Sequence, residues 1–208
     1  MNGKFFDLKK EKQDRMINAA LKVFALQGYR HASTDDMVRE AAISKGLLFH
    51  YFGSKLGVYQ FVYDYSVKYI SLELRRAVDV EEKEFFQVFK QTEYARMTAM
   101  RGYPYMQLFL NRCLAEDVSE ALLAIEEKRI ALEEVYATID SRIDYTLLPQ
   151  GVDGKKLWKM LDLTIKGLMA ECFQNAAFQP EMLYQETCGY LDMVKGLVYG
   201  QAHKEGAG

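Results

Sequence analysis

A short stretch near the N-terminus carries polar and small residues at a spacing that suits contact with a polyanion. The candidate residues are Ser44, Lys45, Gly46, His50, Tyr51 and Lys55. Lys45 begins a predicted helix, where its ammonium and the free backbone N–H groups both favour phosphate or an acceptor base edge. Gly46 has no side chain and allows close approach to a sugar-phosphate backbone. The pattern therefore predicts contacts with duplex nucleic acid.

Three short helices are expected to position these residues. The first runs from about Leu8 to a stop at Gly28, and Ile17, Leu21 and Phe24 lie on its buried face. The second follows Ser33 or Thr34, either of which can cap it. The third spans Lys45 to Tyr51, with Leu48 and Phe52 as its anchor and a tight turn before it. This arrangement is typical of a helix-turn-helix.

Helical periodicity continues through the rest of the chain, and no alternating strand pattern interrupts it. Longer helices are expected over about 55–78, 81–100, 106–113, 117–147, 153–176 and 180–200. The sequence thus predicts an all-α fold of about nine helices. We expect a helix-turn-helix domain over 1–56, a larger helical effector-binding and dimerisation domain over 57–200, and a disordered tail over 201–208.

The charge is distributed unevenly. Residues 1–57 hold ten Lys and Arg against six Asp and Glu, whereas the remainder holds 17 against 23. A basic front on an acidic body indicates a small module that faces polyanions. No apolar run approaches the length of a membrane span, and the N-terminus does not resemble a signal peptide. We therefore expect a cytoplasmic protein without a membrane partner.

The sequence offers little for catalysis. Cys113, Cys172 and Cys188 lie far apart and form no disulfide or metal pattern, and His31 and His203 have no partner spacing. No nucleophile–base pair, metal cluster or phosphate-binding glycine loop is visible. The chain is therefore not expected to be an enzyme or to need a cofactor or metal.

The front of the chain resembles a known family. The stretch from Thr34 to Lys55, TDDMVREAAISKGLLFHYFGSK, is similar to the DNA-binding signature of the TetR family, and ALKVFALQGY over 20–29 resembles its first helix. The resemblance covers about residues 10–62. It implies an all-helical homodimer whose front three helices bind DNA and whose larger C-terminal region binds an inducer and forms the dimer.

The resemblance also assigns residue roles. It implies a phosphate contact at Thr34, which can cap its helix as well, and DNA contacts at Lys45, Gly46, His50, Tyr51 and Lys55. Leu47 stands where the family often has threonine, so a hydrogen bond is replaced by apolar contact with a thymine methyl. Phe49 stands where tyrosine is common, and Asp35 adds an acid near the DNA. These departures bear on the operator sequence.

A group of methionines and aromatics around Gly102 and Pro104 predicts an apolar effector pocket. The proposed lining is Met97, Met100, Tyr103, Met106 and Phe109, with Glu171 or Asn175 as a polar group that orients the ligand. Core packing explains the apolar residues equally well. An apolar or aromatic effector is preferred on this pattern.

The last two predicted helices carry apolar stripes that suit a dimer interface. The interface candidates are Leu161, Leu168, Tyr190, Val194 and Leu197, and Gly167, Gly189 and Gly196 allow close helix approach. A buried face inside the subunit is the alternative. Dimerisation has separate support, because one recognition helix reads too few base pairs for genomic specificity.

Together these features predict a DNA-binding regulator on a near-palindromic operator, most simply a repressor that a small-molecule effector releases. A ligand-dependent activator is an alternative. A helical adaptor without DNA binding is another, and a steep salt dependence of binding to duplex DNA would separate it from a regulator.

Overall fold

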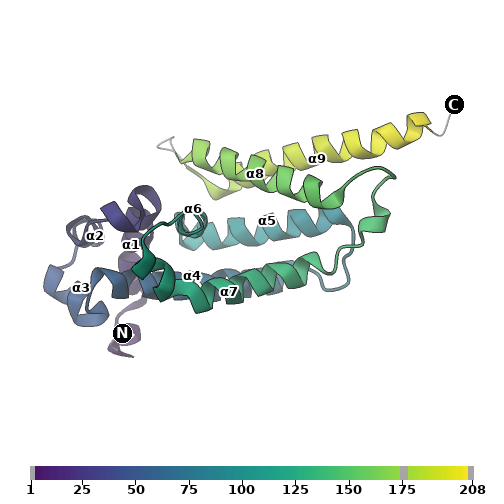
Figure 1. The fold of residues 1–208 in the computed structure, drawn as a ribbon. Helices are drawn as coiled ribbons and strands as arrows, with labels where there is room; N and C mark the ends of the chain where they lie inside the picture. The colour runs from purple at the N-terminus through teal and green to yellow at the C-terminus, as the bar shows by residue number, and fades with distance from the viewer. Residues whose placement is uncertain (1–2, 174–177, 206–208) are drawn as a thin grey trace. The chain divides into compact units, whose positions relative to one another are not determined.

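The computed structural model describes residues 3–173 and 178–205. Over these residues the chain forms nine α-helices, two 3-10 helices and no strand, which confirms the predicted all-α fold (Figure 1). In chain order the elements are η1 Gly3–Asp7, α1 Lys10–His31, α2 Thr34–Ala41, α3 Lys45–Phe52, α4 Lys55–Ala77, α5 Phe85–Gly102, α6 Met106–Cys113, α7 Ser119–Asp140, η2 Tyr145–Leu147, α8 Gly154–Cys172 and α9 Pro180–Glu205.

Short polar side chains cap the predicted second helix and the helix expected from residue 55. The Ser33 hydroxyl accepts the Asp35 N–H at 3.1 Å, and the Ser54 hydroxyl accepts the Gly57 N–H at 3.0 Å. The break expected at Gly28 is present, since this residue has φ +71°, where a side chain would be strained. α1 resumes after this break and ends at His31.

The seventh helix is shorter than predicted. It ends at Asp140, whereas the periodicity suggested a helix to about Leu147. Asp144 explains the difference, because its carboxylate accepts the Thr146 N–H at 3.0 Å and its own N–H donates to the Lys83 carbonyl at 3.0 Å. These bonds turn the chain into η2 instead of continuing α7.

The final helix is longer than predicted. α9 begins at Pro180, as expected, but continues to Glu205, beyond the predicted end near Gly200. No proline or glycine lies between 201 and 205 to end it. The predicted disordered tail, 201–208, therefore overlaps a helix, and residues 206–208 lie outside the described residues, as does the predicted end of the preceding helix at 176.

The chain divides into two compact units. Unit 1 comprises Met1–Ser71 and Ala99–Glu134, and unit 2 comprises Leu72–Thr98 and Val135–Gly208. α4, α5 and α7 each contribute residues to both units. The predicted division of the chain at residue 56 concerns function and stays a prediction.

Aromatic side chains form the core of unit 1. Phe24 of α1, Tyr59 of α4 and Phe109 of α6 are fully buried or nearly so. The Phe24 and Tyr59 ring centroids lie 5.0 Å apart, and those of Tyr59 and Phe109 lie 5.6 Å apart. Edge-on contacts of this kind stabilise a core beyond the area they bury. This core joins α1 to α4 and α6.

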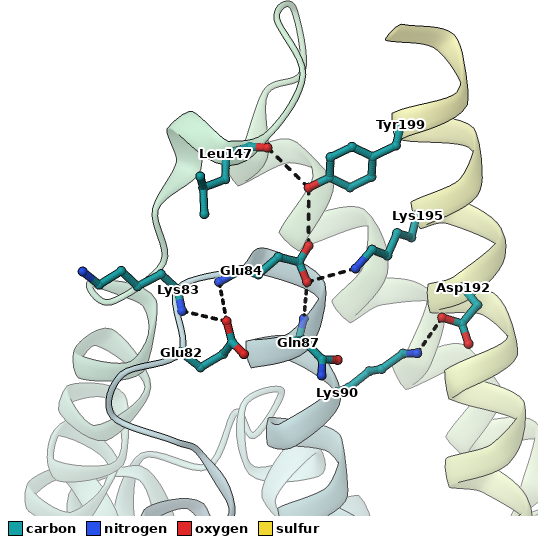
Figure 2. A network of polar contacts seen from close by, with 9 residues as sticks. All are labelled: Glu82, Lys83, Glu84, Gln87, Lys90, Leu147, Asp192, Lys195 and Tyr199. Carbon is teal, nitrogen blue, oxygen red and sulfur yellow. Dashed lines mark hydrogen bonds and ion pairs between the residues drawn. The ribbon is translucent and has the colours of Figure 1, made fainter. Parts of the chain in front are cut away.

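Unit 2 packs α8 and α9 side by side, and charged contacts attach α9 to α5 (Figure 2). The Glu84 carboxylate accepts the Gln87 N–H at 2.9 Å at the start of α5 and accepts the Lys195 ammonium at 3.2 Å. Lys90 forms an ion pair with Asp192 at 2.5 Å. One carboxylate thus caps α5 and holds α9.

Candidate nucleic-acid interface

α2 and α3 are joined by a tight turn that the local sequence specifies. Ala42 has φ +50°, and the Ile43 N–H donates to the Val38 carbonyl at 3.0 Å, so the chain reverses directly after α2. The Ser44 hydroxyl then accepts the Leu47 N–H at 3.2 Å and caps α3. The predicted helix-turn-helix is present, with its second helix at Lys45–Phe52.

The outer face of α3 is polar and small, and its inner face is apolar. Ser44, Lys45, Gly46 and His50 are exposed, whereas Leu48 is buried. Leu47 is half-buried on α3, and Thr34 is half-buried at the first position of α2. The structure thus brings most of the predicted contact residues to the start and outer face of one helix.

Lys45 lies beside the acid that departs from the family pattern. Its ammonium is 2.8 Å from the Asp35 carboxylate, and the two side chains are 50% and 67% exposed. An ion pair this exposed contributes little to stability, so the ammonium is available to a competing phosphate. A phosphate that bound the Lys45 ammonium would therefore have to displace Asp35.

Gly46 has no structural reason to be glycine within the protein. A Cβ atom built there would meet nothing within 4 Å, and its φ angle is not positive. Glycine inside a helix costs about 1 kcal/mol relative to alanine. The open space outside Gly46 fits a surface that another molecule approaches closely.

Tyr51 does not face outward as the sequence pattern predicted. Only 8% of it is exposed, and its ring packs edge-on against Phe5 at 5.6 Å. Phe5 belongs to η1, which Gln13 holds by donating to the Phe6 carbonyl at 3.1 Å. No local sequence signal pairs Tyr51 with Phe5, because the two residues lie far apart along the chain. A DNA contact by the Tyr51 hydroxyl stays a prediction.

Lys55 also has a partner that the sequence pattern did not predict. Its ammonium donates to the Tyr29 carbonyl at 2.9 Å and reaches the Arg30 and Ala32 carbonyls at 3.4 Å. It also lies 4.5 Å from the centroid of the Tyr29 ring. Carbonyls at a helix end lack partners within the helix, and Lys55 supplies one. Its first role is therefore to join α4 to the end of α1, and its phosphate contact stays a prediction.

Acidic residues hold the end of α1 from another direction. The Tyr29 N–H donates to Glu116 at 3.0 Å, and the Tyr29 hydroxyl donates to Glu120 at 2.7 Å. Burial and the Glu120 carboxylate raise the pKa of Tyr29. Arg30 adds an exposed ion pair with Asp117 at 3.3 Å. These contacts fix the turn that precedes α2.

Tyr103, predicted to line a pocket, belongs to a polar network at the start of α1. Its hydroxyl donates to Asp14 at 2.6 Å and accepts the Lys10 ammonium at 3.0 Å. The Tyr65 hydroxyl lies 2.5 Å from it. Burial, followed by the bond to Asp14, raises the pKa of Tyr103. This residue attaches α1 to α4.

Most of the other predicted pocket residues lie in the core. Met97, Met100, Met106 and Phe109 are buried, and Phe109 fills the aromatic core of unit 1. Glu171 is exposed on α8, and Asn175 lies outside the described residues. Packing accounts for the buried side chains, and the pocket stays a prediction.

The predicted interface residues divide between the two faces of α8 and α9. Leu161 is buried inside unit 2; Leu168, Tyr190 and Val194 are half-buried; Leu197 is 60% exposed. The large exposed apolar side chains of α8 and α9 are Met160, Leu163, Met182, Met193 and Leu197, and we call them the exposed apolar face. Leu197 alone among the predicted interface residues belongs to this set. A Cβ built at Gly167, Gly189 or Gly196 would meet nothing within 4 Å.

The described residues hold neither a metal-binding cluster nor a membrane-spanning helix. Across 3–173 and 178–205, no three His, Cys, Asp or Glu side chains gather in a way that could hold a metal ion. No helix in the described part of the chain combines the length and apolar character that crossing a membrane requires.

Comparisons with known proteins match the region of the helix-turn-helix. Residues 16–60 match the model of bacterial regulatory proteins of the tetR family. The chain is 42% identical over 53 residues to the uncharacterized HTH-type transcriptional regulator TtgW of Pseudomonas putida. That match covers 26% of this chain and 40% of TtgW, so the chain spans less than half of this curated relative.

Solved structures extend the likeness to the whole fold. A TetR family transcriptional regulator from Chloroflexus aurantiacus superposes with a TM-score of 0.56 at 20% identity, covering 96% of this chain and 92% of the other. PfmR, a TetR family transcriptional regulator from Thermus thermophilus, gives a TM-score of 0.55 at 20% identity, covering 86% and 96%. At this identity the likeness concerns the fold alone.

Proposed function

Because residues 16–60 match the model of the tetR family of bacterial regulatory proteins, we propose that this chain is a dimeric DNA-binding transcriptional regulator. We further propose that it represses transcription and leaves its operator when a small molecule binds the helical body. The observation that carries the proposal is the outer face of α3, where Ser44, Lys45, Gly46 and His50 lie exposed above an apolar anchor.

In this proposal α3 enters the major groove, which admits an α-helix. Lys45 and the first N–H groups of α3 bind phosphate at its amino end, and Gly46 lets the helix approach the backbone. Thr34, at the first position of α2, binds a neighbouring phosphate. Leu47 contacts a thymine methyl, so this half-buried side chain reads sequence and the polar groups set the register.

The exposed face of α8 and α9 supports a dimer. Met160 and Leu163 on α8 are 48% and 58% exposed, and Met193 on α9 is 55% exposed. Exposed apolar side chains that recur on one helix are common at protein interfaces. Open space at Gly167, Gly189 and Gly196 would admit the helices of a second copy. A dimer presents two recognition helices about 34 Å apart, or at a multiple of that distance, to a near-palindrome.

The proposed release works by population shift. An effector that binds one conformation of the body more tightly than another changes the spacing of the two recognition helices and lowers DNA affinity. α4 contributes residues to both compact units, so a single helix connects the segment after α3 to the body. Such a regulator works where the DNA is, which in a bacterium is the cytoplasm.

The test is fluorescence anisotropy on the duplex upstream of the protein's own gene, titrated across salt concentration. The wild-type chain is expected to bind with a steep negative salt slope, and Lys45→Ala is expected to weaken binding and reduce the slope by about one. Lys68→Ala is the matched control, because Lys68 is also exposed and paired with an acid, Asp64, at 2.7 Å.

The two variants separate the possible outcomes. Equal losses for Lys45→Ala and Lys68→Ala would mean that α3 is not the contact surface. Weak, salt-independent binding to that duplex and to genomic fragments would overturn the regulator proposal in favour of an adaptor. Release by a small molecule is then assayed on the same complex, and increased DNA affinity with ligand would favour an activator.

A further inference from the structure

A hollow of about 320 Å³ in unit 2 lies outside the sites described above. It is bounded by the last residues of α7, by η2 and by the first turns of α8. Its lining consists of Tyr136, Ala137, Asp140, Tyr145, Lys155 and Trp158. Its volume falls at the small end of the range for ligand pockets, and three aromatic rings in such a wall suit a flat apolar ligand.

Two of the rings are held in place. The Tyr145 hydroxyl donates to the Asp140 carboxylate, and the Tyr145 ring lies against Gly154, where a Cβ would approach it to 2.1 Å. Gly154 therefore makes room for this ring. The Trp158 ring packs against Phe89, with centroids 4.6 Å apart. The aromatic wall is thus preorganised, which reduces the entropy that a ligand loses on binding.

The polar groups around the hollow have protons to donate. The Tyr136 hydroxyl oxygen accepts the Arg96 Nε–H at 3.3 Å, which leaves the Tyr136 proton for another acceptor. Among the described residues, the Lys155 ammonium has no ion-pair partner, whereas the neighbouring Lys156 pairs with Asp153 at 3.4 Å. The Asp140 carboxylate already accepts the Tyr145 proton. The donors that remain for a ligand are therefore the Tyr136 hydroxyl and the Lys155 ammonium.

A buried ion pair behind the wall disfavours a cationic ligand at the Tyr136 ring. The Arg96 guanidinium lies 5.2 Å from the Tyr136 ring centroid and is held by Glu93 at 2.6 Å. A ring that already faces one cation attracts a second cation less, because its quadrupole is partly engaged. The exposed Lys155 ammonium at the edge of the hollow would also repel a cationic ligand.

We propose that this hollow binds a planar aromatic carboxylate of one or two rings. The ring lies against Tyr136, Tyr145 and Trp158, and the carboxylate accepts hydrogen bonds from the Tyr136 hydroxyl and the Lys155 ammonium. As a binding site, the hollow does not depend on the regulator function proposed above. As the site of the effector that releases DNA, it rests on that function.

Trp158 supplies the measurement, since it is the sole tryptophan of the chain. The full-length protein is titrated with phenylacetate and with biphenyl-4-carboxylate while Trp158 emission is followed. A saturable change is expected for at least one acid. Phenylacetamide, which keeps the ring but lacks the charge, should bind about tenfold more weakly, and 2-phenylethylammonium more weakly still. No saturable change with either acid, or preference for the cation, overturns the proposal.

Three variants locate the binding. Lys155→Gln and Tyr136→Phe should each weaken acid binding about tenfold, because the first removes the positive charge and the second removes the hydroxyl donor. Lys156→Gln is the control, as it removes the same charge from the next residue of α8. Ala137→Leu, at an exposed lining position, should fill the space and abolish binding without unfolding the protein. Equal affinities for the Lys155 and Lys156 variants, or unchanged binding by Ala137→Leu, would place the ligand elsewhere.

The DNA complex then tests the functional part separately. If the acid binds at Trp158 and also releases DNA, and Ala137→Leu prevents both effects, the hollow is the effector site. If the acid binds at Trp158 and DNA binding is unchanged, the site is correct and its assignment as the effector site is wrong. If the protein does not bind DNA even without ligand, the regulator function proposed above is wrong.

Discussion

The outer faces of α3 and α9 differ in chemistry although both are exposed. α3 presents Lys45 and His50, which water solvates well, whereas α9 presents Met193 and Leu197, which are 55% and 60% exposed. A polar face is stable in contact with water, which suits a partner that binds intermittently, such as DNA. An apolar face gains free energy from permanent cover, about 25 cal/mol per Å² buried. The proposed function uses this contrast, with DNA as a transient partner of α3 and a second copy of the chain as a lasting partner of α9.

The support beneath α3 gives the largest expected effect. Phe5→Ala should lower the free energy of unfolding by about 3–5 kcal/mol, because Phe5 is fully buried against Tyr51, Phe52 and Phe61. Phe6→Ala should cost at most about 1 kcal/mol, since Phe6 is 53% exposed. Urea unfolding measures both variants. If Phe5→Ala lowers the free energy of unfolding no more than Phe6→Ala does, η1 does not support the recognition helix.

The second-largest effect is expected for dimerisation through the exposed apolar face of α8 and α9. Met193→Glu should raise the dimer dissociation constant at least about a hundredfold, because a charge would be desolvated between the subunits. Sedimentation velocity across concentration measures it. Leu123→Glu is the control, since Leu123 is 77% exposed on α7, outside this face. If the wild-type protein is monomeric across the concentration range, α9 has no lasting partner and the contrast with α3 fails.

A substitution at Gly46 tests how closely the polar face of α3 approaches DNA. Gly46→Ala should stabilise the isolated protein by up to about 1 kcal/mol, because alanine favours the helix and the added methyl meets nothing. DNA affinity should fall about tenfold, because the same methyl separates α3 from the backbone. Thermal unfolding and anisotropy measure the two changes. Higher stability with unchanged DNA affinity would show that the approach is not close at this residue.

The smallest effect concerns the ion pair on the outer face. Asp35→Asn should tighten DNA binding by a few-fold, because it releases the Lys45 ammonium from a carboxylate at 2.8 Å. An exposed pair contributes about 0.2–1 kcal/mol, which limits the gain. Asp64→Asn, which releases Lys68 from a similar pair, should leave DNA affinity unchanged. Weaker binding by Asp35→Asn would mean that Asp35 positions Lys45 rather than competing for it.

The front of the molecule was predictable because its signals are local. A cap acts on an N–H two or three residues away, so Ser33 could be recognised from the sequence as a start of α2. Ser44 and Ser54 act in the same local way at the starts of α3 and α4. The roles of Tyr51 and Lys55 depend on partners far along the chain, Phe5 and the Tyr29 carbonyl. No local pattern reports such contacts.

Register on α8 was harder for a different reason. Leu161 faces the interior and Met160 faces outward, yet both are apolar. Periodicity finds a helix with apolar residues on two faces but does not tell the inner face from the outer one. The same ambiguity applies to the methionine and aromatic cluster, where Phe109 fills a core that composition cannot distinguish from a pocket.

The carbonyl site of Lys55 has a consequence for chemical footprinting of this protein. Its ammonium lies among three carbonyl oxygens, at 2.9, 3.4 and 3.4 Å, whereas Lys45 and Lys68 lie on the surface. An acylating reagent needs a free lone pair on nitrogen and room to approach. Lys55 should therefore be acylated slowly while its neighbours are labelled quickly. Mass spectrometry of that single amine would report whether the end of α1 and the start of α4 are still joined.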